Sequence, residues 1–311
     1  MACVTLLLPA RSRLPEAAIA APVARALDRA LAAHSSAGEQ AQLARHFCVA
    51  DAGWPVAALT RQRDVGDAAD GVWLRADPCH VAPDMHGARM LAHGPTLGLE
   101  AADGQAYAAV LEPLFAEAGL LFDAPTADRW YIKLPSDAVL PEFADPEDVL
   151  GDDLFGHLPQ GASGRRWRAL LSEAQVLLHT HPHTAQRLAQ GKRAVNSLWF
   201  WGAGALPSSV STPHQQVRSP DPLVLALAAA AGVAVAEPVA GAQASGDVLV
   251  DLRQLRSLQQ FADGAVQPLL AALARGELKR VQLDFEDGLQ LQLDRQQRWK
   301  FWARPRPLHS A

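Results

Sequence analysis

The chain has 311 residues, of which 49% are hydrophobic and 20% charged, so it contains enough apolar material for a buried core. Its formal net charge of −5 gives no general attraction to nucleic-acid phosphates. The basic clusters are short runs, such as Arg165-Arg166-Trp167-Arg168, which is typical of a solvated helix start. We therefore expect no nucleic-acid partner.

The compartment can be inferred from the cysteines and the apolar runs. Cys3, Cys48 and Cys79 are odd in number and widely spaced, which favours a reducing compartment over a disulfide framework. The apolar start of the chain is followed by Arg11 and Arg13, and an export signal has its basic residues first. The longest uncharged stretch, 222–236, has 15 residues, whereas a spanning helix needs about 20. We expect a cytoplasmic protein with no membrane partner.

The predicted strands and helices alternate along the chain. Apolar and β-branched runs predict strands at 4–8, 71–76, 120–122, 130–134, 197–201, 233–235 and 248–250. Helical spacing predicts helices at 17–33, 39–47, 104–119, 165–179, 223–231 and 265–274. The segment 280–301 alternates apolar and polar residues around Asp287-Gly288, which predicts a β-hairpin.

This order predicts an α/β fold with a mainly parallel sheet flanked by helices and a C-terminal antiparallel β-hairpin. Residues 141–164 have the prolines, glycines and acidic residues of a loop. Because no long linker or repeat is visible, we expect a single α/β unit over 1–311 with a soft boundary between halves 1–150 and 151–311.

Three segments are candidates for chemistry. The first, Asp77-Pro78-Cys79-His80, follows a predicted strand, and its proline predicts a loop at the end where open α/β sheets bind ligands. Asp77 and His80 can bind a metal or exchange protons there, but capping a turn is an equally simple role for the aspartate. The second, His179-Thr180-His181-Pro182-His183, is dense in imidazoles, but its spacing does not place them on one helix face.

The third segment, Asn196-Ser197-Leu198-Trp199-Phe200-Trp201-Gly202-Ala203-Gly204, is the most specific string in the chain. On a strand, Trp199 and Trp201 point to the same side. The two glycines allow close approach of a ligand or a sharp turn. The structural alternative is that both indoles fill the core.

This third segment resembles the Asn-x-x-Trp-x-Trp-Gly-x-Gly segment of archaeal-type, cofactor-independent phosphoglycerate mutases of the alkaline phosphatase superfamily. Lys192-Arg193 is similar to the basic residues that precede that segment there. Several stretches, namely 73–80, 173–179, Arg187 with Gly191, and 196–204, also resemble the RpfE-type regulatory protein family of bacteria. The resemblance to the mutases is tight over about 20 residues, and the RpfE-type resemblance covers most of 70–302.

The mutase resemblance implies two divalent metals held by Asp and His clusters, with a serine that attacks phosphate. The chain departs from that pattern. Its first strand is followed by Pro9-Ala10-Arg11 with no carboxylate, and Asp247 and Asp251 have no histidine after them before His309. We therefore assign no catalytic residue, no metal ligand and no cofactor.

The leading hypothesis is a catalytically degenerate mutase-like protein that acts as a regulatory or ligand-binding protein. Its expected partners are a phosphorylated or anionic small molecule and a protein. The expected ligand-binding residues are Asp77, His80, Glu173, His179, Arg193, Asn196, Trp201, Gly202 and Gly204. One alternative is a metal-dependent phosphotransferase or phosphohydrolase with a site rearranged around Asp77, His80, Glu173 and His179. Another is a scaffold in which these segments are purely structural.

Overall fold

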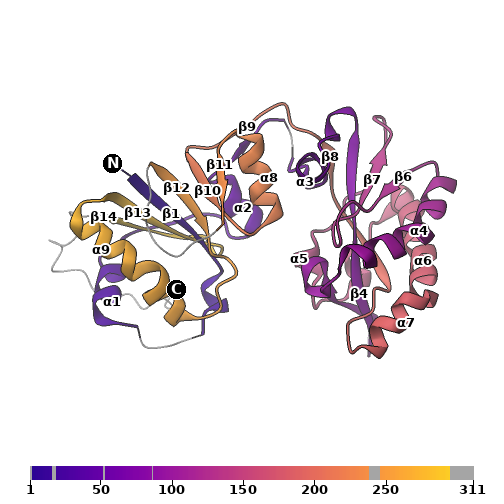
Figure 1. The fold of residues 1–311 in the computed structure, drawn as a ribbon, viewed down its shortest axis with the longest axis horizontal. Helices are drawn as coiled ribbons and strands as arrows, with labels where there is room; N and C mark the ends of the chain where they lie inside the picture. Colours follow the sequence, from indigo (N-terminus) through magenta and orange to yellow (C-terminus); the bar gives the residue numbers. More distant parts are fainter. Residues whose placement is uncertain (1, 16–18, 52, 86, 238–245, 295–311) are drawn as a thin grey trace. The chain divides into compact units, whose positions relative to one another are not determined.

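The computed structural model describes residues 2–15, 19–51, 53–85, 87–237 and 246–294 (Figure 1). The chain forms two compact units. The first combines residues 1–50 with 208–311, and the second is residues 51–207, inserted within it. This division differs from the halves 1–150 and 151–311 expected from the sequence.

The first unit is built on a seven-stranded sheet in the order β11-β10-β12-β1-β13-β14-β2. The pairs β10–β11, β10–β12, β1–β12 and β1–β13 are parallel, whereas β13–β14 and β14–β2 are antiparallel. The strands are β1 (Ala2–Leu8), β2 (Leu31–His34), β10 (Gln216–Arg218), β11 (Ala234–Ala236), β12 (Asp247–Asp251), β13 (Leu278–Phe285) and β14 (Leu289–Asp294). The predicted mainly parallel sheet with a C-terminal hairpin is confirmed. Residues 295–301 of the predicted hairpin lie outside the described residues.

Helices flank this sheet. Alternate residues of β1, Val4, Leu6 and Leu8, pack in one core with residues of α1 and α9, while Leu7 is buried outside that core. A strand that is apolar on both sides needs such cover on both faces of its sheet. The helical segments are η1 (Arg11–Arg13), α1 (Ala21–Asp28), α2 (Glu39–Ala44), α8 (Pro222–Ala230), the π-helical η5 (Gln260–Val266) and α9 (Gln267–Arg275).

The helix predicted over 17–33 is wrong at its C-terminal end. The helix α1 ends at Asp28, and 31–34 forms the edge strand β2, in which Ala32 and Ala33 pair with Leu291 and Gln290 of β14. Alanine is the best helix former, but intrinsic helix propensity is a weak contribution that tertiary context often overrides, and here pairing with the open edge of the hairpin decides. A short ladder between β3 (Cys48–Val49) and β9 (Val210–Ser211) completes the unit.

The second unit contains a separate antiparallel sheet in the order β5-β4-β7-β6, with β8 pairing to β4. The order of strands and helices predicts one mainly parallel sheet, and for these strands that prediction is wrong. The long strand β4 turns directly back into β5, a local hairpin that sequence order alone did not reveal. The strands are β4 (Val72–Asp84), β5 (Gly87–His93), β6 (Leu121–Asp123), β7 (Tyr131–Leu134) and β8 (Ser197–Ala205).

Helices cover the two faces of this sheet differently. On one face, residues of α4 and α6 pack with Leu74, Ala76, Leu198 and Phe200. On the other, Ala57 and Ala58 of α3 pack with the buried Trp73 and Tyr131. The helical segments are α3 (Val56–Asp64), η2 (Ala68–Asp70), η3 (Gly94–Leu97), α4 (Ala101–Glu117), α5 (Pro146–Val149), η4 (Leu154–His157), α6 (Gly161–Thr180) and α7 (Pro182–Ala189).

Pro78 lies inside β4, so the predicted loop at 77–80 is wrong. On one side, β4 pairs with β8 from Val72 to Cys79, with a register shift between Trp73 and Arg75. On its other side it pairs with β7 over 72–75 and with β5 from Cys79 onward, which leaves a gap at Pro78. The amide of Ala76 donates to Trp130 on this second side, and residue 78 faces the same way because alternate residues do. The proline thus stands where no ladder hydrogen bond is needed.

None of the helices among the described residues is both long and apolar enough to cross a membrane.

Candidate functional site

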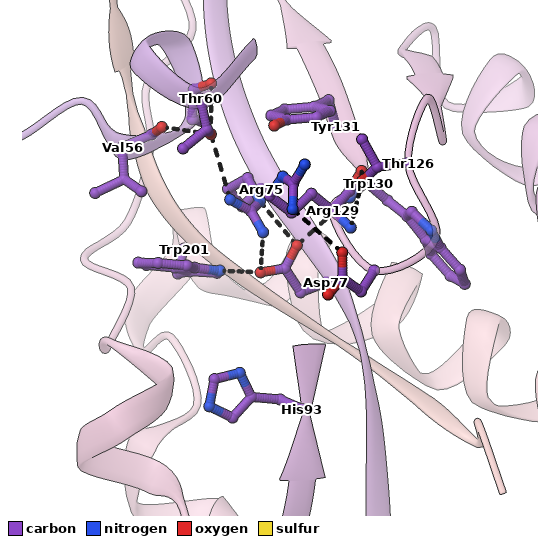
Figure 2. Close-up of polar contacts among 12 residues, drawn as sticks. Val56, Thr60, Arg75, Asp77, His93, Thr126, Arg129, Trp130, Tyr131 and Trp201 are labelled. Carbon is purple, nitrogen blue, oxygen red and sulfur yellow. Dashed lines mark hydrogen bonds and ion pairs between the residues drawn. The ribbon is translucent and has the colours of Figure 1, made fainter. Parts of the chain in front are cut away.

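The centre of the candidate site is an ion pair on β4. Arg75 and Asp77 are two residues apart on this strand, so their side chains share a face. Arg75 donates to both carboxylate oxygens of Asp77, from Nε and from one terminal nitrogen, each over 2.8 Å (Figure 2). Trp201 of β8 donates from Nε1 to the same carboxylate over 2.7 Å. Both charged side chains are buried.

Aromatic rings and a hydroxyl enclose the guanidinium of Arg75. Its central carbon lies 5.3 Å from the ring centre of Tyr131 and 5.4 Å from that of Trp201, within range of cation–π attraction. Its remaining terminal nitrogen donates to the hydroxyl of Thr60 over 3.3 Å. That hydroxyl donates in turn to the carbonyl of Val56 within α3. The guanidinium is therefore held in one orientation from three elements.

A second ion pair lies beside the first. Arg129 donates to both oxygens of Asp64, over 2.8 and 2.9 Å, and the hydroxyl of Tyr131 donates to Asp64 over 2.6 Å. Burial opposes ionisation of Asp64, but these hydrogen bonds prevail and hold its pKa below the usual value. Burial raises the pKa of the Tyr131 hydroxyl, so it remains a donor.

The rim of the site is formed by Asp128, Arg129 and Trp201, all half-buried. Burial raises the pKa of Asp128, and the nearby charge of Asp77 adds to this effect, although Arg129 opposes it. Arg129 reaches Asp128 only through a long contact of 3.4 Å. The rim therefore exposes part of the Trp201 indole and part of the Arg129 guanidinium. The carboxylate of Asp128 beside them is bound only weakly.

Trp199 and Trp201 lie on one side of β8, as predicted, and Leu198 and Phe200 lie in the core on the other side. Trp199 is buried with Met90 and donates from Nε1 to the carbonyl of Ala144 over 2.9 Å. Trp201 is half-buried. The indole of Trp199 therefore fills core space, whereas that of Trp201 is partly accessible to solvent.

Gly202 and Gly204 bring β8 against the start of α3. Gly202 has φ +64°, and a Cβ there would lie 2.9 Å from the Cβ of Val56. A Cβ on Gly204 would lie 2.6 Å from the Cβ of Pro55. In this structure the glycines therefore allow close approach of a helix, which places Thr60 against Arg75.

Asn196 and His80 connect strand β4 to the segment that precedes β8. The side chain of Asn196 accepts from the amide of Val81 over 2.8 Å and donates to its carbonyl over 2.7 Å, at an irregularity in the β4–β5 ladder. Nδ1 of His80 lies 3.1 Å from the carbonyl of Ala194, so it carries the proton. Burial lowers the pKa of His80, which favours the neutral ring. Both side chains bind backbone.

The other expected residues are not brought to Asp77. Glu173 and His179 are exposed on α6, a helix that packs on the opposite face of the sheet from Asp77, so the expectation of one pocket shared with His179 is wrong. Arg193 is exposed and donates to the carbonyl of Leu91 over 3.1 Å.

Five residues of this site are not indicated by the sequence patterns, namely Arg75, Thr60, Asp64, Arg129 and Tyr131. Arg75 could have been identified, because it stands two residues before Asp77 at the end of a predicted strand, so the two side chains must share a face. The partners on α3 and β7 carry no such local signal.

The parallel sheet of the first unit also places acidic residues at its carboxyl edge. Asp251 ends β12, Asp284 lies near the end of β13, and both stand opposite Leu7 of β1. Asp247 lies at the other end of β12, where it accepts from the amide of Cys3. The carboxyl edge is where open α/β sheets bind ligands.

The donor set at this edge does not fit a pair of divalent metals. Arg45 donates to both oxygens of Asp284 over 2.9 and 2.6 Å, and His46 lies 2.8 Å from the same carboxylate. Asp251 is likewise bound by Arg253. Within the described residues, no group of three or more His, Cys, Asp and Glu side chains is arranged to hold a metal ion.

These features define an α/β protein with a parallel-sheet unit, an inserted antiparallel unit and buried guanidinium–carboxylate networks in both. No protein-family profile matches the chain. Part of the sequence is similar to 2,3-bisphosphoglycerate-independent phosphoglycerate mutases. It is 38% identical over 66 residues to a probable enzyme of this kind from Geobacter sulfurreducens, covering 21% of this chain and 16% of that one. It is 35% identical over 66 residues to the enzyme from Methanosarcina mazei, covering 21% and 17%.

The chain therefore matches only about a sixth of the length of these relatives. Among solved structures, a cofactor-independent phosphoglycerate mutase from Thermoplasma acidophilum gives a TM-score of 0.40 at 13% identity, over 95% of this chain and 89% of that one. The PH0037 protein from Pyrococcus horikoshii gives 0.42 at 12% identity, over 94% and 87%. The local similarity in sequence confirms the predicted resemblance to the mutases, whereas the RpfE-type resemblance stays a prediction.

Proposed function

We propose that this chain is a catalytically inactive relative of the phosphoglycerate mutases that binds a phosphorylated or anionic small molecule. In this role it acts as a cytoplasmic regulatory protein of the RpfE type, with a protein partner that reads the bound state. The observation that carries the proposal is the rim of the Arg75–Asp77 site, where Arg129 and Trp201 reach solvent beside Asp128.

The chemistry of this rim favours an anion. Asp64 accepts from Nε and one terminal nitrogen of Arg129, so the other terminal nitrogen has the 3.4 Å contact with Asp128 to exchange for a ligand. A phosphate that replaces Asp128 there gains a charge-assisted hydrogen bond, and the raised pKa of Asp128 lowers the cost of that replacement. The indole of Trp201 provides an apolar wall, as ligand sites commonly do.

The proposed lack of catalysis is supported by the residues that would have to bind the metals. The strand β1 ends at Leu8 and is followed by Pro9-Ala10-Arg11, so it supplies no carboxylate to the edge of the sheet. A phosphotransferase rearranged around Asp77, His80, Glu173 and His179 is the alternative. It is disfavoured because Glu173 and His179 lie on a helix across the sheet from Asp77.

Calorimetric titration with phosphoglycerate tests the proposal, with glycerate as the probe that lacks the phosphate. We expect phosphoglycerate to bind and glycerate to bind more weakly. In the Arg129→Met variant, the two molecules should bind with the same affinity. Arg89→Met is the matched control, because Arg89 forms an exposed ion pair with Asp84 elsewhere in the same unit. Equal binding by Arg129→Met and the wild type would refute this site, and no binding at all would favour a purely structural role.

A further inference from the structure

A second arginine is surrounded by carboxylates at the carboxyl edge of the parallel sheet. Arg253 follows β12 and donates to both oxygens of Asp251, over 2.9 and 2.8 Å. It also donates to Asp221 over 2.8 Å and to Glu39 at the start of α2. Its side chain is 11% exposed and that of Asp251 only 2%. One guanidinium thus binds three carboxylates that come from three segments of the chain.

The surroundings of Asp251 complete this arrangement. Ser219, directly after β10, donates from its hydroxyl to Asp251 over 2.7 Å and accepts from the amide of Asp221. Asp221 caps the start of α8 through the amides of Leu223 and Val224. The loops that leave two neighbouring parallel strands therefore meet at one cation. Ligands of open α/β sheets bind at the same position.

The mutase resemblance implies divalent metals, and the residues at this edge do not fit them. We propose that Arg253 is a built-in cation that takes the place of a divalent metal among Asp251, Asp221 and Glu39. This inference deepens the proposed inactive function, since it gives the reason why the unit needs no metal to hold its carboxyl edge.

The physical difference between the two cations favours this reading. A guanidinium remains charged at any physiological pH and presents a planar set of donors that fits a carboxylate in two-point contact. It is covalently attached, so a chelator cannot remove it. Burial alone would raise the pKa of Asp251, but the hydrogen bonds and charge of Arg253 hold that pKa below its usual value.

Removal of the guanidinium should convert this edge into a site that depends on added cations. We expect Arg253→Ala to melt at a lower temperature than the wild type and to regain part of the loss with Mn²⁺, because the three carboxylates then lose the guanidinium that binds them. Calorimetry should show Mn²⁺ binding to this variant at least about tenfold tighter than to the wild type. Arg275→Ala is the matched control, because Arg275 forms an exposed pair with Glu277 in the same unit.

The wild type provides a test that does not depend on the variant folding. Its melting temperature should be the same in EDTA and in Mn²⁺, and a fall in EDTA would overturn the proposal. An Arg253→Ala protein that melts equally with and without Mn²⁺ would also overturn it. If that variant is insoluble, Arg253→Lys should retain most of the stability and remain insensitive to Mn²⁺, whereas sensitivity would count against the proposal. Failure of phosphoglycerate binding leaves these results unchanged, so the two proposals fail separately.

Discussion

Replacement of Trp199 and Trp201 by alanine should separate the buried half of β8 from its accessible half. Trp199 is 3% exposed and packs against Met90, Val149 and Leu154. Its loss should cost about 3–5 kcal/mol through the cavity it leaves. The carbonyl of Ala144 also loses its donor, which adds about 1–3 kcal/mol if water cannot reach it. Against a total stability of roughly 5–15 kcal/mol, this change is severe.

Trp201→Ala should cost less. Its indole is half-buried, and its hydrogen bond to Asp77 is worth about 1.5–3 kcal/mol, at the lower end because water can take its place. Asp77 also keeps both hydrogen bonds from Arg75. We therefore expect Trp201→Ala to fold. The Trp199→Ala variant should be recovered poorly, or should unfold at a much lower urea concentration than the wild type.

Tryptophan fluorescence during urea unfolding measures this difference in the relevant unit. Six of the eight tryptophans lie within 51–207, so the signal reports mainly on the inserted unit. They are Trp54, Trp73, Trp130, Trp167, Trp199 and Trp201. Equal and severe destabilisation by both alanine variants would show that Trp201 is core as well, and would remove it from the rim of the proposed site.

Three further predictions follow from the site and its surroundings. Mutase assays with or without Mn²⁺ should give no turnover, and turnover in the usual enzyme range of about 1–1,000 per second would refute inactivity. Gly204→Ala should destabilise the inserted unit because its Cβ would meet Pro55, whereas Gly156→Ala, which meets nothing within 4 Å, should not. Burial, aided by His46, lowers the pKa of His214 to about 4 from 6.5, so the unfolded chain binds more protons between these values. Stability should therefore fall as pH falls from 6.5 toward 4, and His214→Gln should flatten that slope if the reasoning holds.

Local signals in the sequence were sufficient for the elements that local physics decides. The hairpin of β13 and β14 follows from alternation around Asp287-Gly288, where Gly288 has φ +89°. The parallel core follows from short apolar strands separated by helices. The same signals could not separate two sheets, because a strand such as β7 looks alike whether its partner is parallel or antiparallel.

The candidate site was predicted only in part, for a related reason. Asp77 and Trp201 were identified from their own segments, and they do meet. Thr60 and Arg129 come from α3 and the segment before β7, and only the tertiary fold brings them to Arg75 and Asp64. The assignment of Glu173 and His179 to the same pocket as Asp77 was wrong, because their sequence pattern does not indicate which face of the sheet α6 covers.

The insertion of one unit into the other sets an order in which the chain can fold during synthesis. The inserted unit, 51–207, contains all the partners of its own sheet and is complete once residue 207 has been made. Among the strands that the structure describes, β1 by contrast pairs with β12 and β13, and its partner residues there lie more than 240 positions later. Because domains generally fold as units as they emerge, β1 must wait, apolar and without a neighbouring strand, while the inserted unit folds. A nascent chain from which residue 207 has emerged can therefore carry a folded inserted unit while its first strand still exposes apolar side chains.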